Sequence, residues 1–168
     1  MKKALVITTA FLIALTLTGC IGLFIALNDD RVPRDEIFSY VNTNYELLET
    51  FPYDELEEIK YASDDSETKE QKKDAFIKKH LGDDTIVKSV YAYNENILDF
   101  YCGGTGMLKH SSYSGFYFSK EDIPFAFEFG DVALTETESD VFEWEDKRHN
   151  VHVEKIRDNW WYYLLEWI

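Results

Sequence analysis

The sequence predicts an α+β domain in which one or two helices pack on an antiparallel sheet of five to seven strands, preceded by an N-terminal membrane segment. Three observations support this. Residues 1–27 are almost entirely apolar after two lysines, and residues 34–51 carry apolar side chains at helical spacing. After residue 84, β-branched and aromatic runs alternate with turn-forming residues, as in an antiparallel sheet.

Residues 1–27 form the segment by which we expect the protein to be held at a membrane. In one interpretation Leu-Thr-Gly-Cys at 17–20 is a lipobox-like cleavage site, and Cys20 takes the lipid, as in bacterial lipoproteins. In the other interpretation residues 4–27 are an uncleaved transmembrane helix, whose length would be roughly 36 Å. The small residues before Cys20 favour the lipoprotein, while the apolar residues after it favour the helix, so both interpretations stay open.

Either interpretation attaches one domain to the outer side of the cytoplasmic membrane. Residues 28–33 are polar and form a juncture, and residues 34–168 are long enough for a single extracytoplasmic domain with its own core. Lys2 and Lys3 carry the positive charge that is typical of the cytoplasmic end of such a segment.

The charge of the domain limits its partners. The net charge is −15, and because Lys2 and Lys3 are the only charged residues of the leading segment, residues 28–168 carry 15 basic and 32 acidic residues. Such a surface repels phosphate backbones and anionic lipid headgroups, so we expect no nucleic-acid partner. Aromatic residues make up 16% of the chain, which indicates a folded body with an acidic surface and not a disordered acidic chain.

Two stretches before residue 84 are predicted to be helical. Pro33 suits a first helical turn, Asp35 and Glu36 suit the positive end of the helix dipole, and the helix should end near Phe51. A second helix is expected from Thr68 onward, closed by a glycine at residue 82. The acidic residues 64–67 between them are predicted to be a loop.

The strands follow residue 84. A hairpin is expected from two runs around the turn 94–96, and a third strand from the run that follows the glycines of 103–106. The predicted strands are residues 86–93, 97–102, 113–118, 125–129, 141–144, 151–156 and 160–168. The last run has large apolar residues on both faces, so we expect it to be a central or covered strand and not an exposed edge. A cystatin-like arrangement is the nearest architecture by analogy.

The domain contains several short sequence motifs, which follow one another along the chain. They are YCGG at 101–104, SSY at 111–113, GFYFS at 115–119 followed by Asp122 and Pro124, and NWWYY at 159–163. In these motifs the chain resembles a family of small membrane-anchored or lipoprotein-type proteins of Gram-positive gut bacteria. The resemblance implies no catalytic or ligand-binding residue, because the family has no assigned activity.

Cys102 and His110 are the candidates for a nucleophilic site. A nucleophile needs a base within hydrogen-bond reach and a third group that orients this base, and nothing in the spacing of the two residues demands either. We therefore expect Cys102 to be a small buried side chain at the end of a strand.

No cofactor or metal site is predicted. The acidic residues 64–67 lack the spacing of a calcium loop, and the glycines of 103–106 precede a strand where a phosphate-binding loop precedes a helix. His149 and His152 should lie on opposite faces of a strand or at its end, which does not favour zinc.

Three functions remain from the sequence. The first is a non-enzymatic binding or accessory domain, held at the membrane through residues 1–27, with a protein or peptide partner. The second is a cell-envelope hydrolase that uses Cys102, His110 or a pair of carboxylates. The third is a carbohydrate-binding module, which requires several exposed and coplanar aromatic side chains. We expect the first, without catalysis, because no catalytic signature is present.

Overall fold

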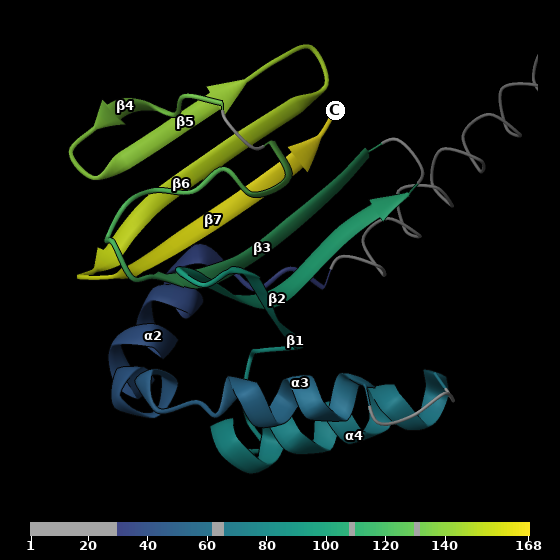
Figure 1. Ribbon diagram of the computed structural model, residues 1–168. Helices are drawn as coiled ribbons and strands as arrows, with labels where there is room; N and C mark the ends of the chain where they lie inside the picture. The colour runs from purple at the N-terminus through teal and green to yellow at the C-terminus, as the bar shows by residue number, and fades with distance from the viewer. Residues whose placement is uncertain (1–29, 62–65, 108–109, 130–131) are drawn as a thin grey trace, which may run out of the picture.

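A computed structural model describes residues 30–61, 66–107, 110–129 and 132–168 of the chain (Figure 1). Three α-helices pack against one seven-stranded antiparallel sheet in these ranges, so the α+β fold class is confirmed. The predicted membrane segment 1–27 lies outside the described residues. None of the helices within the described ranges has the length and apolar character needed to cross a membrane.

Helix α2 (Arg34–Glu49) is the helix that the apolar spacing predicts. Pro33 precedes it with an extended backbone, and Asp35 and Glu36 occupy its first turn. Its apolar stripe is buried against the sheet, and its buried residues are Ile37, Val41 and Leu48. Arg34 also pairs with Glu154 of the sheet, which fixes the start of the helix.

Helices α3 (Tyr53–Tyr61) and α4 (Ser66–Leu81) lie side by side below the sheet (Figure 1). The sequence predicts α4 but not α3, which lies in a stretch dominated by charge and, among its described side chains, fully buries only Leu56. Gly82 follows α4 with a φ of +91°, the left-handed conformation that ends helices.

The strands form one sheet in the order β1-β2-β3-β7-β6-β5-β4, with every neighbouring pair antiparallel. Their bounds are β1 (Ser89–Asn94), β2 (Ile97–Met107), β3 (His110–Ser119), β4 (Thr135–Glu138), β5 (Val141–Glu145), β6 (His149–Arg157) and β7 (Trp160–Trp167). Strand β7 is central, between β3 and β6, as its two apolar faces predict.

The connection between β3 and β4 determines how the second face of the sheet is covered. From β3 the chain crosses to the far edge, and then returns strand by strand until β7 pairs with β3 (Figure 1). The crossing segment, residues 120–134, contains the short 3-10 helix η1 (Phe127–Phe129) and packs its aromatic side chains on the sheet.

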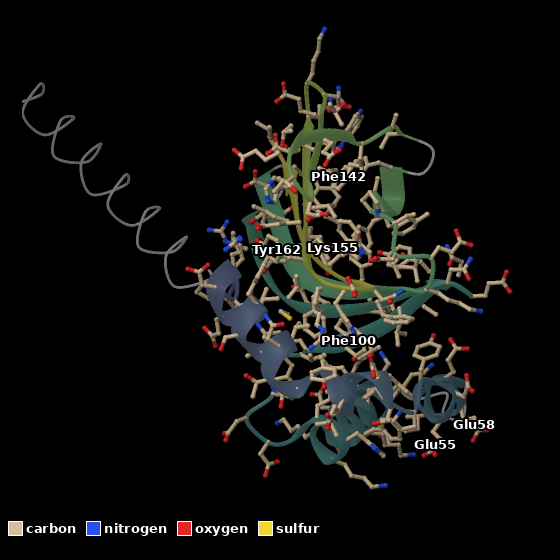
Figure 2. The ribbon with its side chains drawn as sticks, turned by 90° about the vertical axis from the view of Figure 1, so that its left-hand side faces the viewer. Glu55, Glu58, Phe100, Phe142, Lys155 and Tyr162 are labelled. Atoms are coloured by element: carbon tan, nitrogen blue, oxygen red, sulfur yellow. The ribbon has the colours of Figure 1, made fainter. Side chains whose placement is uncertain are left out.

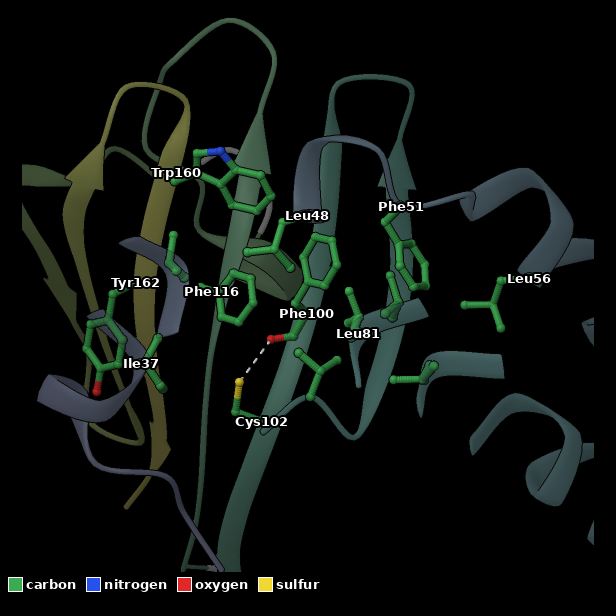
Figure 3. Close-up of a cluster of buried hydrophobic side chains, with 14 of the residues drawn as sticks. Ile37, Leu48, Phe51, Leu56, Leu81, Phe100, Cys102, Phe116, Trp160 and Tyr162 are labelled. Atoms are coloured by element: carbon green, nitrogen blue, oxygen red, sulfur yellow. Dashed lines mark hydrogen bonds between the residues drawn. The ribbon is translucent and has the colours of Figure 1, made fainter. Parts of the chain in front are cut away.

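The helix-facing side of the sheet forms the larger core (Figure 3). Phe100 and Phe116 of neighbouring strands stack with ring centroids 5.0 Å apart, and Trp160 packs beside both. Phe51, from the connection between α2 and α3, meets Phe100 edge-on at 5.8 Å. The helices therefore cover the part of this face that β1, β2, β3, β7 and β6 form, with aromatic and aliphatic side chains.

The opposite face carries the second core. Alternation along the strands places Phe142 and Lys155 on this side, away from Phe100 and Tyr162, which face the helices (Figure 2). The crossing segment covers part of this face, where Phe125 and Phe127 pack on Tyr117 of β3 and Phe127 also packs on Tyr163 of β7.

Three local predictions are wrong. Strand β2 does not stop at the glycines of 103–106 but continues to Met107, with a bulge between Tyr101 and Gly103. Residues 125–129 alternate like a strand but form a turn, because Phe127 has a φ of +54°. Residues 135–138, which lie outside the predicted strands, form the exposed edge strand β4.

Candidate functional site

The structure places the sequence-predicted candidates apart. Cys102 is fully buried in the helix-facing core, where its Sγ lies 3.5 Å from the carbonyl oxygen of Phe100 (Figure 3). Burial raises the pKa of the Cys102 thiol well above its ordinary value, which disfavours the reactive thiolate. Cys20 lies outside the described residues.

His110 begins β3 and pairs with Met107. Met107 is five positions from Cys102 along β2, which corresponds to about 16 Å at the rise of an extended strand. The sheet therefore does not bring Cys102 and His110 together.

The two histidines of the β5–β6 region lie on opposite faces of the sheet, as predicted. His149 packs against Phe129 and donates a hydrogen bond from Nδ1 to Oδ1 of Asp146 at 3.0 Å, while His152 lies against Tyr162 on the helix side. Within the described ranges, no three His, Cys, Asp or Glu side chains gather closely enough to hold a metal ion.

A groove lies on the sheet face opposite the helices, at the end that the crossing segment leaves uncovered. We call it the tyrosine groove; its volume is about 860 Å³. Four strands and the crossing segment supply its lining, which consists of Tyr91, Ala92, Tyr93, Asp99, Tyr101, Ser111, Tyr113, Phe127, Tyr163, Leu165 and Trp167.

Strand register explains why these side chains meet. Tyr91 of β1 pairs with Asp99 of β2, so both side chains point to the same face. Tyr101 follows two positions later on the same side, and Tyr113 and Tyr163 reach this face from β3 and β7. Every second residue of four neighbouring strands therefore contributes to one surface.

The groove is a folded surface of aromatic rings, not a flat platform. Tyr91, Tyr93 and Tyr113 are 42%, 43% and 38% exposed. The ring of Tyr113 is inclined by 52° to that of Tyr101 and by 89° to that of Trp167, with ring centroids 6.2 Å and 5.1 Å apart. These rings do not provide the coplanar stack that a flat sugar-binding platform requires.

Asp99 is the only acidic or basic residue among the described side chains that line the groove. It is 3% exposed, and its Oδ1 has no hydrogen-bond partner among the described residues. Burial raises the pKa of the Asp99 carboxyl to about 8, and a hydrogen bond with Tyr163 offsets part of this increase. Asp99 is therefore largely protonated at neutral pH and changes its charge just above it.

Gly115 allows Tyr163 to reach Asp99. Tyr163 stands on β7 and Asp99 on β2, with β3 between them, and Gly115 is the β3 residue paired with both Tyr163 and Tyr101. A Cβ at Gly115 would lie 2.7 Å from the hydroxyl oxygen of Tyr163 and 2.5 Å from the carbonyl oxygen of Phe100. The missing side chain thus leaves the space through which the phenol ring crosses β3.

The crossing segment holds one end of the groove in place. Phe127 contacts Tyr93 and Tyr163 with ring centroids 5.1 Å and 4.4 Å apart. Lys155 of β6 binds Asp122 at the start of this segment with an Nζ–Oδ2 distance of 2.6 Å. The crossing segment is therefore part of both the second core and the groove, through Phe127.

Chemically, the site combines aromatic ring faces with one buried carboxyl group. Aromatic faces attract cations and stack on flat apolar groups. A carboxyl oxygen without a partner accepts a hydrogen bond from a ligand that reaches it. Comparisons with family models, with curated proteins and with solved structures give no match to the chain, so the function is argued from this geometry.

Proposed function

We propose that the protein is a membrane-held extracytoplasmic binding domain, without catalysis, whose tyrosine groove receives a segment of a protein or peptide partner. The observation that carries the proposal is the groove itself: an aromatic surface left uncovered at one end of a sheet face on which the crossing segment packs elsewhere. Exposed aromatic residues gathered in one concave place are typical of ligand and partner sites.

The start of the described chain lies close to this groove. The backbone N–H of Asp30 is 3.4 Å from the carbonyl oxygen of Gly104, and its Oδ1 accepts the N–H of Gly104 at 2.9 Å. A Cβ at Gly104 would be 3.1 Å from the hydroxyl of Tyr101, which lines the groove. If residues 1–27 are the membrane anchor, the chain that leads from it would join the domain beside the groove.

This position supports a partner that is itself at the membrane. If residues 1–27 are the anchor, only residues 28–30 separate it from the contact with Gly104, and three extended residues span at most about 11 Å. The groove would then stand within a short distance of the membrane surface. The partner that we propose is accordingly the extracytoplasmic segment of another membrane-associated protein.

The groove is tested by photocrosslinking in the native membrane. A photoreactive phenylalanine analogue at Tyr113 should give an adduct of one size, and the same analogue at Leu47 of α2 should not. Leu47 is a matched position because it is 42% exposed against 38% for Tyr113. The adduct should disappear when Tyr91→Ala is added. Equal adducts from both positions, or none from either, would overturn the proposal.

The anchor is tested separately by labelling cells with a fatty-acid probe. Label that depends on Cys20 supports the lipoprotein interpretation, and membrane retention of an unlabelled chain supports the transmembrane helix. Loss of the wild-type chain from the membrane fraction would overturn both.

A further inference from the structure

We propose that the tyrosine groove recognises a primary ammonium group, the end of a lysine side chain of the partner, with Asp99 as its counter-ion. This inference rests on the proposed function and names the chemistry of the same site. It concerns one occupant, a lysine-bearing peptide segment, and it is carried by the free oxygen of Asp99, the rings around it and the charge of the domain.

The Asp99 carboxyl group has an oxygen without a hydrogen-bond partner among the described residues. A buried polar atom without a partner is costly, and buried polar groups in proteins are almost always hydrogen-bonded. Oδ1 of Asp99 has no partner among the described residues, and it belongs to a groove-lining residue. An N–H donor placed in the groove would satisfy it.

The number of free oxygens selects the kind of cation. Asp99 already has a hydrogen bond with Tyr163, and Oδ1 is the oxygen without a partner. A guanidinium group binds a carboxylate best through two parallel hydrogen bonds, which needs both oxygens. An ammonium group needs only one, whereas a quaternary ammonium has no N–H to donate. The geometry thus favours lysine over arginine and over trimethylated lysine.

The rings supply the second contact. Tyr91 lies directly opposite Asp99 on β1, and Tyr101 is two residues from it on β2, so their rings flank the carboxyl group. Cations within about 6 Å of an aromatic ring centroid are attracted to its face. The aliphatic stem of a lysine would pack on the same rings.

Access to Asp99 requires one ring to move. Asp99 is 3% exposed, but Tyr91 stands on the edge strand β1 and is itself 42% exposed. Rotamer changes of exposed side chains are fast and cost little compared with backbone motion. We therefore expect that rotation of Tyr91, the neighbour of Asp99 on β1, opens a path from the groove to the carboxyl group.

The charge of the domain supports a cationic ligand. Outside the leading segment, acidic residues outnumber basic ones by 32 to 15. Such a field attracts a cationic segment and speeds its association.

The proposal predicts an affinity that depends on pH. The groups facing Asp99 are Tyr91 and Tyr93 of β1, Tyr101 of β2, Tyr113 and Tyr117 of β3, and Tyr163 of β7, with Cys102 and the ion pair of Asp30 and Lys88 behind them. Burial raises the pKa of Tyr101 to about 12 and the pKa of Tyr163 well above its ordinary value. Asp99 is therefore the group that gains charge near pH 8, and its ionisation should strengthen cation binding.

The experiment uses the full chain in zwitterionic nanodiscs and four capped tripeptides, acetyl-Gly-X-Gly-amide. X is lysine, norleucine, arginine or trimethyllysine, and the fluorescence of Trp167 or NMR shifts report binding. The lysine peptide should bind best, and its Kd should fall roughly 20-fold from pH 6.5 to pH 8.5 if binding requires ionised Asp99 with a pKa near 8.

Asp99→Asn should abolish both the preference for lysine over norleucine and the pH dependence. Asp35→Asn, which removes a carboxylate that is 91% exposed on α2, should change neither. The circular dichroism spectrum and unfolding midpoint of each variant show that it is folded.

Several results would overturn the proposal. One is a lysine preference that survives Asp99→Asn. Another is equal binding of norleucine, or stronger binding of a neutral oligosaccharide at low pH, which would assign the groove to an uncharged ligand. If no peptide binds while the crosslinked adduct at Tyr113 still forms in membranes, the ammonium proposal fails and the proposed binding function stands.

Discussion

The two faces of the sheet are built by alternate residues of the same strands, yet they do different things. The face toward the helices presents Phe100, Phe116 and Trp160, all almost fully buried and packed ring against ring. The other face presents Tyr91, Asp99 and Tyr113 along the same pleats, and the crossing segment covers only part of it. The first face therefore stabilises the fold. The second face buries less apolar surface, because it carries polar groups and aromatic rings that stay exposed.

The largest expected effect is on the helix-facing side. Phe100→Ala removes a fully buried ring from the stack with Phe116 and should lower the free energy of unfolding by about 3–5 kcal/mol. Tyr91→Ala on the groove side should change it by less than about 0.5 kcal/mol, because that ring is 42% exposed. Chemical denaturation of the full chain measures both. Similar losses for the two variants would mean that the faces do not differ in the way described.

The next effect concerns the buried carboxyl group. The folded protein holds the Asp99 proton up to about pH 8, while the unfolded chain releases it near the ordinary value of 3.8. Between these values the folded state binds one more proton, so the stability that Asp99 permits at low pH is lost as the pH rises towards 8. Asp99→Asn has no proton to lose, so its free energy of unfolding should not change in this way. Relative to the wild type, the variant should become more stable by about 1.4 kcal/mol for each pH unit between these two pKa values.

Denaturation curves at pH 5, 6 and 7 test this expectation. The difference between variant and wild type should increase across these points and become constant above pH 8. Parallel pH profiles would show that Asp99 is not buried as a proton-holding acid. Asp122→Asn serves as the control. Partial burial raises the pKa of the Asp122 carboxyl, but hydrogen bonds from Lys155 and Asn159 outweigh this effect and hold the pKa below its ordinary value. The difference between this variant and the wild type should therefore stay constant between pH 5 and pH 7.

Gly115→Ala should lower the free energy of unfolding by an intermediate amount, about 1–3 kcal/mol. Its methyl group would lie 2.5 Å from the carbonyl oxygen of Phe100 and 2.7 Å from the hydroxyl oxygen of Tyr163, which is too close without a shift of these atoms. Displacement of Tyr163 should also change the pH at which Asp99 titrates. Gly82→Ala, which is strained by its φ of +91° but has open space around it, should cost stability without altering that titration. A Gly115→Ala variant with an unchanged pH profile would contradict the role assigned to the glycine.

The smallest effect is expected where the crossing segment is fastened. Lys155→Gln breaks the ion pair with Asp122, whose side chain is 32% exposed, so the loss should be about 0.5–1 kcal/mol. Hydrogen exchange should increase in the segment around Phe127 and not in α2. Equal exchange in both places would mean that the ion pair does not hold the segment.

The elements with strong periodicity are the ones that the sequence predicts correctly. Helix α2, the β5–β6 hairpin and the last strand combine regular spacing with clear turn residues. Helix α3 and strand β4 lack such a pattern, because α3 fully buries only Leu56 among its described side chains and all four residues of β4 are exposed. Residues 125–129 alternate because their aromatic rings pack on a sheet face, not because the segment is part of a sheet.

The site was harder to predict than the fold. A single acidic residue between Leu98 and Phe100, inside an apolar strand, was the available signal for Asp99. Alternation alone would have placed Tyr91 and Tyr93 on one face. Which half of that face stays open depends on the crossing of residues 120–134 to the far edge, and this long-range connection leaves no local trace in the sequence.

The attachment of Asp30 to β2 has a mechanical consequence. Asp30 precedes α2 in the chain, and it is bound to the sheet region by its hydrogen bonds with Gly104 and its ion pair with Lys88. If the N-terminus is anchored and the groove holds a ligand, tension between them would pass through these bonds into β2, the strand that carries Asp99, before it reaches any helix. The sheet would thus bear the pulling force, and the helices would not.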